Sequence, residues 1–259
     1  MLLSQRLIST LRASGGGSGP GPQEMTYDAA TDTGYYGEVS AAELVTGAAL
    51  ASVIGLSDGT ASADAGWLKF YVGPNADCNR GSTAYVLFVA KMPLRRNLNW
   101  HHINNARPVN GSGAQITVGT DSYKVRLLTG ADADPSTYTA GTTCAQNPGA
   151  GSEWNDLFYR IHVDAPNCAT PTVGVSGGHE TTRHGGPQVG ANWDDLTDAE
   201  TGVLHTLTPG SACWCQEVDG ANESQRVRRG SLGVADFFSG PASSSNSHFG
   251  WRPALELVG

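Results

Sequence analysis

The sequence predicts an α+β protein: a β-rich, loop-heavy globular domain preceded by a short N-terminal helix and a Gly/Pro linker. The chain has 259 residues, enough to bury a core without crosslinks. Its 34 glycines and 13 prolines, with only 15% charged residues, favour strands and loops, because both residue types are disfavoured inside helices. From Trp67 onward, short apolar runs recur between clusters of Gly, Asn, Asp and Pro, which is typical of strands.

Residues 1–14 predict an amphipathic helix of about three turns. Its apolar side chains share one face and are the candidate anchoring residues: Leu3, Leu7, Ile8 and Leu11. Residues 15–22 (GGGSGPGP) follow as a linker with flexible glycines and a proline-stiffened end. A helix held beyond a linker needs another surface for its apolar face, so we expect it to dock on another protein or to self-associate. The alternative is a frayed end.

Residues 23–66 predict a small Ala-rich adapter region. Apolar residues between Glu38 and Ile54 have the spacing of one or two short helices. Ser40 and Glu43 form a Ser-x-x-Glu capping box, a pattern that begins helices. We expect this helical piece to pack on the β-rich remainder, residues 67–259.

Alternation and β-branched or aromatic composition predict five strands in the β-rich part. They span residues 67–72, 84–91, 115–118, 123–128 and 158–163. The second contains an unbroken apolar run, as expected for a central strand buried on both faces. Short helices, each with a tryptophan that fixes it to the core, are expected at 97–105 and 192–200. Long loops at 129–152, 164–191 and 231–249 are expected to be functional or covered by neighbours.

The last fifth of the chain predicts a final strand. Trp251, Pro253, Leu255 and Leu257 fall on one side of an extended segment, with Arg252 on the other. Three motifs precede or form this ending: W-C-Q-E at 214–217, R-V-R-R-G at 226–230 and G-W-R-P-A-L-E-L at 250–257. In this order they resemble the C-terminal half of the formylglycine-generating-enzyme type of C-type-lectin-like fold.

Three further segments resemble small tailed-bacteriophage virion proteins that share this ending. They are G-Y-Y-G-E-V-S-A-A-E-L-V-T-G at 34–47, Y-K-V-R-L-L-T-G at 123–130 and E-W-N-D-L-F-Y-R-I at 153–161. The resemblance covers residues 34–259 and implies a C-type-lectin-like domain over 67–259. It also implies a place on the virion surface, in the tail or on the capsid.

The resemblance leaves two function classes open. One is a tail or fibre-associated adhesin that binds a host-surface glycan or protein. The other is a capsid decoration, head-fibre or collar protein that stabilises the particle without receptor binding. In both, we expect a homo-oligomer attached to other virion proteins through the N-terminal helix. We expect no enzyme activity, because many proteins with this fold have none.

The stretch from 231 to 249 supplies the candidate ligand-binding residues. Small adaptable polar side chains lie there between aromatic rings, a composition typical of binding loops. The candidates are Phe238, Ser243, Ser244, Ser245, Asn246, His248 and Phe249. The alternative is that Phe237, Phe238 and Phe249 cap the core beneath an inert loop.

The chain has an odd number of cysteines: Cys78, Cys144, Cys168, Cys213 and Cys215. At least one is therefore unpaired within the chain or pairs between chains. Cys213 and Cys215 lie two positions apart on an expected strand, too far for easy bridging. Formylglycine-generating enzymes use a more widely spaced cysteine pair for copper-dependent oxidation. We therefore expect buried thiols or one or two structural disulfides here, not a catalytic pair.

Metal and cofactor sites are not expected. His179-Glu180 and His184 have one residue too many for the zinc motif H-E-x-x-H, and flanking glycines disfavour the helix it needs. W-N-D at 154–156 resembles a calcium-binding motif of C-type lectins but lies mid-chain without an E-P-N partner. We expect it to be structural, with calcium near Asp156 left open. No phosphate-binding or dinucleotide-binding glycine motif is present.

Charge and hydropathy argue against two further classes of partner, nucleic acids and membranes. The net charge of −8 argues against nucleic-acid binding, whose electrostatic footprint is basic. No apolar run approaches the roughly 18 residues of a membrane-spanning helix, so membrane insertion is not expected.

Overall fold

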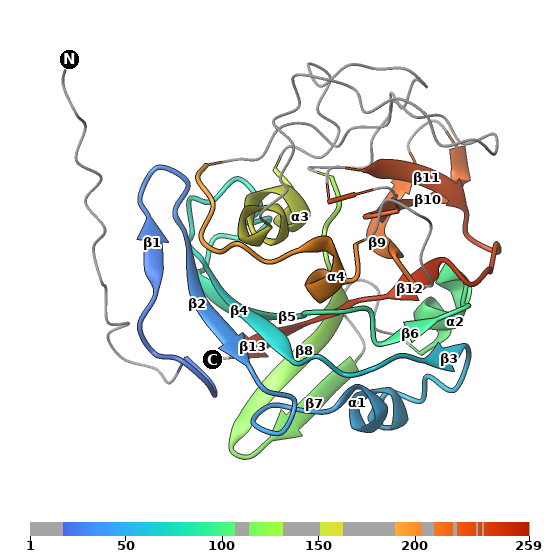
Figure 1. Cartoon of the computed structure of the whole chain (residues 1–259), viewed down its shortest axis with the longest axis horizontal. Helices are drawn as coiled ribbons and strands as arrows, with labels where there is room; N and C mark the ends of the chain where they lie inside the picture. The colour runs from blue at the N-terminus through green and yellow to red at the C-terminus, as the bar shows by residue number, and fades with distance from the viewer. Residues whose placement is uncertain are drawn as a thin grey trace.

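The computed structural model describes residues 18–106, 114–131, 151–162, 190–203, 210–219, 222–231, 233–234 and 236–258 (Figure 1). Two sheets of seven and six strands form its frame, and the helices are few and short. The β-rich class is therefore confirmed. The helix predicted at 1–14, with Leu3, Leu7, Ile8 and Leu11, lies outside the described residues.

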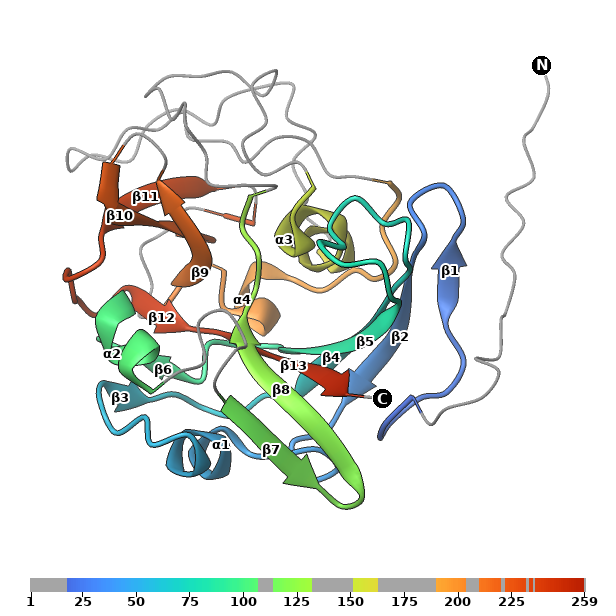
Figure 2. The same cartoon turned by 180° about the vertical axis from the view of Figure 1, so that it is seen from behind.

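The seven-stranded sheet holds β13 (Pro253–Val258) in its interior, between β5 (Tyr85–Ala90) and β8 (Asp121–Leu127). Its strands, in spatial order, are β1 (Thr26–Asp28), β2 (Thr33–Val39), β4 (Trp67–Val72), β5, β13, β8 and β7 (Ala114–Val118). All neighbours are antiparallel. Figures 1 and 2 show β13 between β5 and β8 from both sides. The four strands predicted between 67 and 128 are thereby confirmed, with small changes at their ends.

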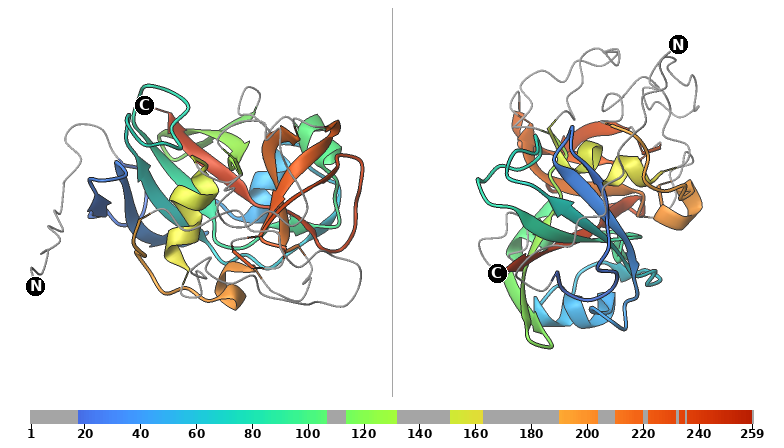
Figure 3. Two further views of the ribbon diagram at one scale, coloured as in Figure 1. Left: turned by 90° about the horizontal axis from the view of Figure 1, so that it is seen from above. Right: turned by 90° about the vertical axis from the view of Figure 1, so that its left-hand side faces the viewer.

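The six-stranded sheet lies beside it (Figure 3). Its spatial order is β11 (Phe237–Pro241), β10 (Asn222–Arg229), β9 (Ala212–Asp219), β12 (Phe249–Trp251), β6 (Arg95–Arg96) and β3 (Thr60–Ala61). β12 runs parallel to β9, and the other neighbours are antiparallel.

The chain passes from one sheet to the other at Arg252. The prediction of a single strand from 251 with Arg252 facing outward is therefore wrong. Arg252 is 1% exposed, and its Nη1 donates to the carbonyl oxygens of Ala90 at 2.8 Å and Lys91 at 2.5 Å. The buried guanidinium thus joins β12 and β13 to the end of β5.

Apolar side chains pack on both faces of the seven-stranded sheet. On β5, Leu87 and Val89 belong to one core cluster, whereas Phe88 and Ala90 belong to the other. All four are 0% exposed. Because successive side chains of a strand point to opposite faces, this alternation confirms that the 84–91 run is buried on both sides.

The region 23–66 contains one short helix within the range predicted for one or two. It contributes β1 and β2 to the seven-stranded sheet, and its helix is α1 (Gly47–Val53). The capping box does form, since the Ser40 amide donates to the Glu43 carboxylate at 3.0 Å and the Glu43 amide donates to Ser40 Oγ at 3.3 Å. It closes a turn instead of a helix. Residues 33–39 are extended because they pair with β4, a partner that a local pattern does not reveal.

Of the two short helices predicted in the β-rich part, one forms as expected and the other is shorter. α2 (Trp100–Asn105) confirms the helix at 97–105, and α4 (Asp198–Thr201) forms only at the end of 192–200. The strand predicted at 158–163 is wrong, because α3 (Glu153–Asp156) leads into the 3₁₀ helix η1 (Phe158–Ile161). All four η1 residues are 0% exposed, so their composition carries no alternation to separate a strand from a buried helical turn.

Part of the predicted linker is fixed to the sheet. Lys69 on β4 is 0% exposed, and its Nζ donates to Ser18 Oγ at 3.0 Å and to the carbonyl oxygens of Pro20 at 3.0 Å and Pro22 at 2.6 Å. The ammonium also lies 4.6 Å from the centroid of the Tyr36 ring. We call residues 18–22 the strap. The strap is the proline-containing end of the predicted linker, and its carbonyl oxygens accept hydrogen bonds from the buried ammonium. Residues 15–17 lie outside the described residues.

Because of Lys69, the free energy of unfolding should depend on pH in the alkaline range. Burial lowers the pKa of Lys69 from its usual 10.5 to about 8. Between these values the unfolded chain keeps the proton that the folded protein has lost, so the free energy of unfolding should rise with pH. The difference between the two pKa values corresponds to a change in the free energy of unfolding of roughly 3 kcal/mol at most.

The measurement is urea unfolding of the wild type and Lys69→Met at several values between pH 7 and 10.5. The wild type should gain stability relative to the variant across this range. Lys91→Met serves as the control: it removes a lysine that pairs with Glu38 but keeps Lys69, so it should gain stability with pH as the wild type does. Parallel pH curves for the wild type and Lys69→Met would contradict the prediction.

Candidate functional site

The connection between β11 and β12, residues 242–248, is fixed at both ends and exposed in its middle. We call it the serine loop. The Ala242 amide donates to the Ser224 carbonyl at 2.9 Å, the Trp100 amide donates to the Ala242 carbonyl at 3.0 Å, and the Ala212 amide donates to the His248 carbonyl at 2.9 Å. Of its candidate binding residues, Ser243, Ser245 and Asn246 are exposed, and Ser244 and His248 are partly exposed.

The aromatic rings beside the serine loop pack around an arginine. The Arg228 guanidinium lies 3.9 Å from the ring centroid of Phe249, 4.3 Å from that of Phe238 and 5.0 Å from that of Trp214. Phe249 is 9% exposed and meets Trp214 edge-on at 5.3 Å between centroids. Phe249 and the fully buried Phe237 therefore belong to the core, whereas Phe238 remains half-buried at the surface.

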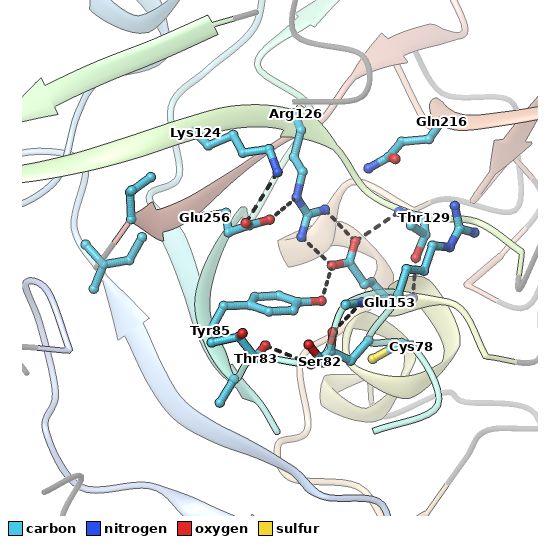
Figure 4. A pocket seen from close by; sticks show the side chains of 16 residues that line it. Cys78, Ser82, Thr83, Tyr85, Lys124, Arg126, Thr129, Glu153, Gln216 and Glu256 are labelled. Atoms are coloured by element: carbon cyan, nitrogen blue, oxygen red, sulfur yellow. Dashed lines mark hydrogen bonds and ion pairs between the residues drawn. The ribbon is translucent and has the colours of Figure 1, made fainter. Parts of the chain in front are cut away.

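A separate cavity of about 500 Å³ opens between α3 and the seven-stranded sheet (Figure 4). Its walls come from residues 78–85, from β8, β9 and β13, and from Thr129 and Glu153. In Figure 4, Lys124, Arg126 and Glu256 lie along one side, Glu153 faces Arg126, and the Tyr85 ring lies below Glu256 with its hydroxyl directed at Glu153.

Arg126 is the centre of the charged wall. Its Nε donates to Glu256 at 2.7 Å, its Nη1 donates to Glu153 at 2.7 Å, and its Nη2 also donates to Glu153. Glu153 further accepts from the Tyr85 hydroxyl at 2.8 Å and the Thr129 amide at 3.0 Å. Arg126 and Glu153 are 5% and 1% exposed, so this is a buried, bidentate ion pair.

Burial and pairing act in opposite directions on these groups. Burial alone would lower the pKa of Arg126, but the Glu153 carboxylate outweighs it and raises that pKa. Burial would raise the pKa of Glu153, but Arg126 and the hydrogen bonds hold it below its usual value. Burial, together with the Glu153 charge, raises the pKa of Tyr85 well above its usual value, so its hydroxyl remains a donor.

A second ion pair lies at the rim of the cavity. Arg80 Nη2 donates to Glu217 at 2.6 Å, and the Gly130 amide donates to the same carboxylate at 2.8 Å. The Glu217 side chain is fully buried, whereas the Arg80 side chain is 40% exposed. Burial raises the pKa of Glu217 to about 7, although Arg80 opposes the change.

The W-N-D segment packs into the core. Trp154, Asn155 and Asp156 are at most 2% exposed. The Trp154 indole donates to the Val234 carbonyl at 2.7 Å, and Arg229 donates to the Asn155 side-chain oxygen at 2.6 Å. Burial, with the nearby Asp77 charge, raises the pKa of Asp156 to about 7. Within the described ranges, no three His, Cys, Asp or Glu side chains are placed to hold a metal ion.

Three cysteines are buried free thiols: Cys78, Cys213 and Cys215. This is one of the two predicted arrangements. Burial raises the pKa of Cys213 above its usual value, so the thiol is not poised as a thiolate nucleophile. Cys144, Cys168 and the histidine segment from His179 to His184 lie outside the described residues.

Sequence reasoning did not find the cavity. Lys124, Arg126 and Glu256 belong to segments that the sequence predicts as strands, and Arg126 is separated from Glu153 by 27 positions and from Glu256 by 130. A local signal was available, because Arg126 and Glu256 each interrupt an apolar strand. A charge inside such a strand is rarely buried without a partner.

Comparison with known proteins identifies no relative. No family model matches the chain, no curated protein matches it, and no solved structure matches it. Among the residues that the structure describes, no helix has the length and apolar character needed to cross a membrane.

Proposed function

We propose that this chain is a bacteriophage virion protein that acts as a tail or fibre-associated adhesin and binds the host surface through the serine loop. The observation that carries the proposal is a polar loop exposed in its middle and hydrogen-bonded at both ends to the six-stranded sheet and α2. A loop whose backbone is already ordered loses little conformational entropy on binding, so its side chains can contribute more of their interaction energy.

The motif order supports the virion assignment and a C-type-lectin-like fold for residues 67–259. Two small sheets that hold long connections are consistent with that fold. The exposed part of the site is Phe238, Ser243, Ser244, Ser245, Asn246 and His248. Phe249 supports the loop from beneath through Trp214 and Arg228.

The remaining parts of the proposal concern partners. The apolar residues at 1–14 would attach the protein to another virion protein, and several copies would act together to raise avidity. The host ligand is a surface glycan or protein. No catalytic residue, cofactor or metal takes part.

A glycine variant of the loop tests the proposal. Ser243, Ser244 and Ser245 are replaced by Gly, while Asn246 is kept because its Oδ1 accepts from the His248 amide at 2.8 Å. Stability should change little, since each surface substitution is worth about ±0.5 kcal/mol. Adsorption of phage carrying the variant to host cells should fall about tenfold, the equivalent of about 1.4 kcal/mol.

The control is Ala29→Gly with Ala30→Gly, which adds backbone freedom at two positions of the exposed β1–β2 turn. It should leave adsorption unchanged. If the serine-loop variant also adsorbs normally while present at full copy number on the particle, the adhesin proposal fails. The decoration, head-fibre or collar role would then replace it.

A further inference from the structure

We propose that the cavity between α3 and the seven-stranded sheet binds a neutral, hydroxyl-rich ligand, such as a single saccharide residue. This site lies near the C-terminal end of β13, whereas the serine loop joins β11 to β12 at the other end of the molecule (Figure 1). The proposal does not depend on the function proposed for the serine loop.

The size of the cavity suits a small ligand. Its volume of about 500 Å³ falls within the range of roughly 300–1,000 Å³ typical of small-molecule sites. One wall belongs to the rigid core, since it includes strands of the seven-stranded sheet and the fully buried Glu153; the opposite wall is the exposed segment 80–84. A cavity held open by such elements is largely formed before any ligand arrives.

The charges of the walls favour a neutral ligand. Arg126 is neutralised by Glu153, Lys124 lies 3.5 Å from Glu256, and Arg80 pairs with Glu217. Each cation therefore has a carboxylate close by. An ionic ligand would have to compete with these pairs and leave one member without its partner, at a large desolvation cost. A neutral ligand would leave the pairs intact.

The same pairs still offer hydrogen bonds at the cavity wall. Glu153 already accepts four hydrogen bonds, but an ammonium has three donors and a guanidinium five, so Lys124 and Arg80 have more donors than their ion pairs use. Lys124 and Arg80 are partly exposed, with 32% and 40% of their side chains accessible. Alternating donors and acceptors in fixed positions suit the adjacent hydroxyl groups of a sugar, each of which donates and accepts.

Apolar surface completes the site. The half-buried Tyr85 ring lies along the cavity in Figure 4, and Leu257 and Val258 also line it. Sugar rings carry apolar C–H faces that pack on aromatic and aliphatic side chains. The combination of paired charges, a tyrosine ring and aliphatic edges is what distinguishes this cavity from a site for a metal or a phosphate.

The test is saturation-transfer NMR on the full chain with neutral sugars: glucose, galactose, mannose and N-acetylglucosamine. N-acetylneuraminic acid serves as the acidic comparison. At least one neutral sugar should bind, and more tightly than the acidic one. Ser82 is exposed at the rim, so Ser82→Trp should fill the entrance without disturbing the core and should abolish binding.

Ser57→Trp, at an exposed position that does not line the cavity, is the matched control and should bind as the wild type does. Lys124→Gln should weaken binding at least fivefold, whereas Lys91→Gln should not. Absence of binding by all four neutral sugars, preference for the acidic sugar, or binding that survives Ser82→Trp would each overturn the proposal. So would loss of binding in the serine-loop glycine variant, because the sugar would then sit on that loop.

Discussion

Trp251→Ala is expected to lower the free energy of unfolding by about 3–5 kcal/mol. Trp251 ends β12, is 0% exposed and lies in the core cluster together with Trp67 and Trp214. Its carbonyl accepts from the Leu94 amide at 2.9 Å, and it pairs with Arg95 on β6. Removal of the indole leaves a cavity where the chain crosses between the sheets, and the surrounding backbone is too constrained to fill it.

Urea unfolding followed by circular dichroism measures the effect. Val258→Ala is the control at the other end of the same segment, since Val258 is 43% exposed and its truncation should cost less than about 0.5 kcal/mol. A loss of under 1 kcal/mol for Trp251→Ala would show that this residue does not join the two sheets.

Glu153→Ala is the second change with a large expected effect, about 3–5 kcal/mol. It removes the bidentate partner of Arg126 and leaves a buried guanidinium, while the Tyr85 hydroxyl and Thr129 amide lose their acceptor. Glu256→Ala should cost less, because Glu256 is 23% exposed and water can replace it.

Two further measurements identify the ion pair as the cause. The double variant Arg126→Met with Glu153→Leu should recover part of the stability, since an apolar pair avoids the desolvation cost. The folded pKa of Glu153 lies below its usual 4.5, so its contribution is present above that pH and lost as the pH falls through the folded pKa. A double variant no more stable than Glu153→Ala would contradict this explanation.

The strands that could be predicted were those whose pattern is local. Residues 67–72 and 84–91 carry their alternation or apolar run within six to eight positions, and they form β4 and β5. β2 could not be found in this way, because glycines and tyrosines at 34–37 become a strand only through pairing with β4. η1 was missed for a related reason: Arg160 is held by Thr33 at 2.9 Å and Asp28 at 2.6 Å, partners far away in the sequence.

In the candidate sites too, some features have a local sequence signal and others depend on residues far away in the sequence. Exposure of Ser243 to Asn246 follows from their composition and was predictable. The burial of Phe249 depends on Trp214 and Arg228, which come from other strands. The strap likewise requires Lys69, whose alternating neighbours gave no sign that its ammonium is enclosed by residues 18–22.

The interior position of β13 has a consequence for folding during synthesis. The ribosome makes this strand after the six others of its sheet, so the emerging chain holds β1, β2, β4 and β5 in one group and β7 and β8 in another. Until residues 253–258 appear, β5 and β8 each present an unpaired apolar edge, the kind of surface that pairs with other chains. Nascent chains stalled before Pro253 should therefore recruit chaperones or aggregate, whereas full-length chains join the two groups in a single late step.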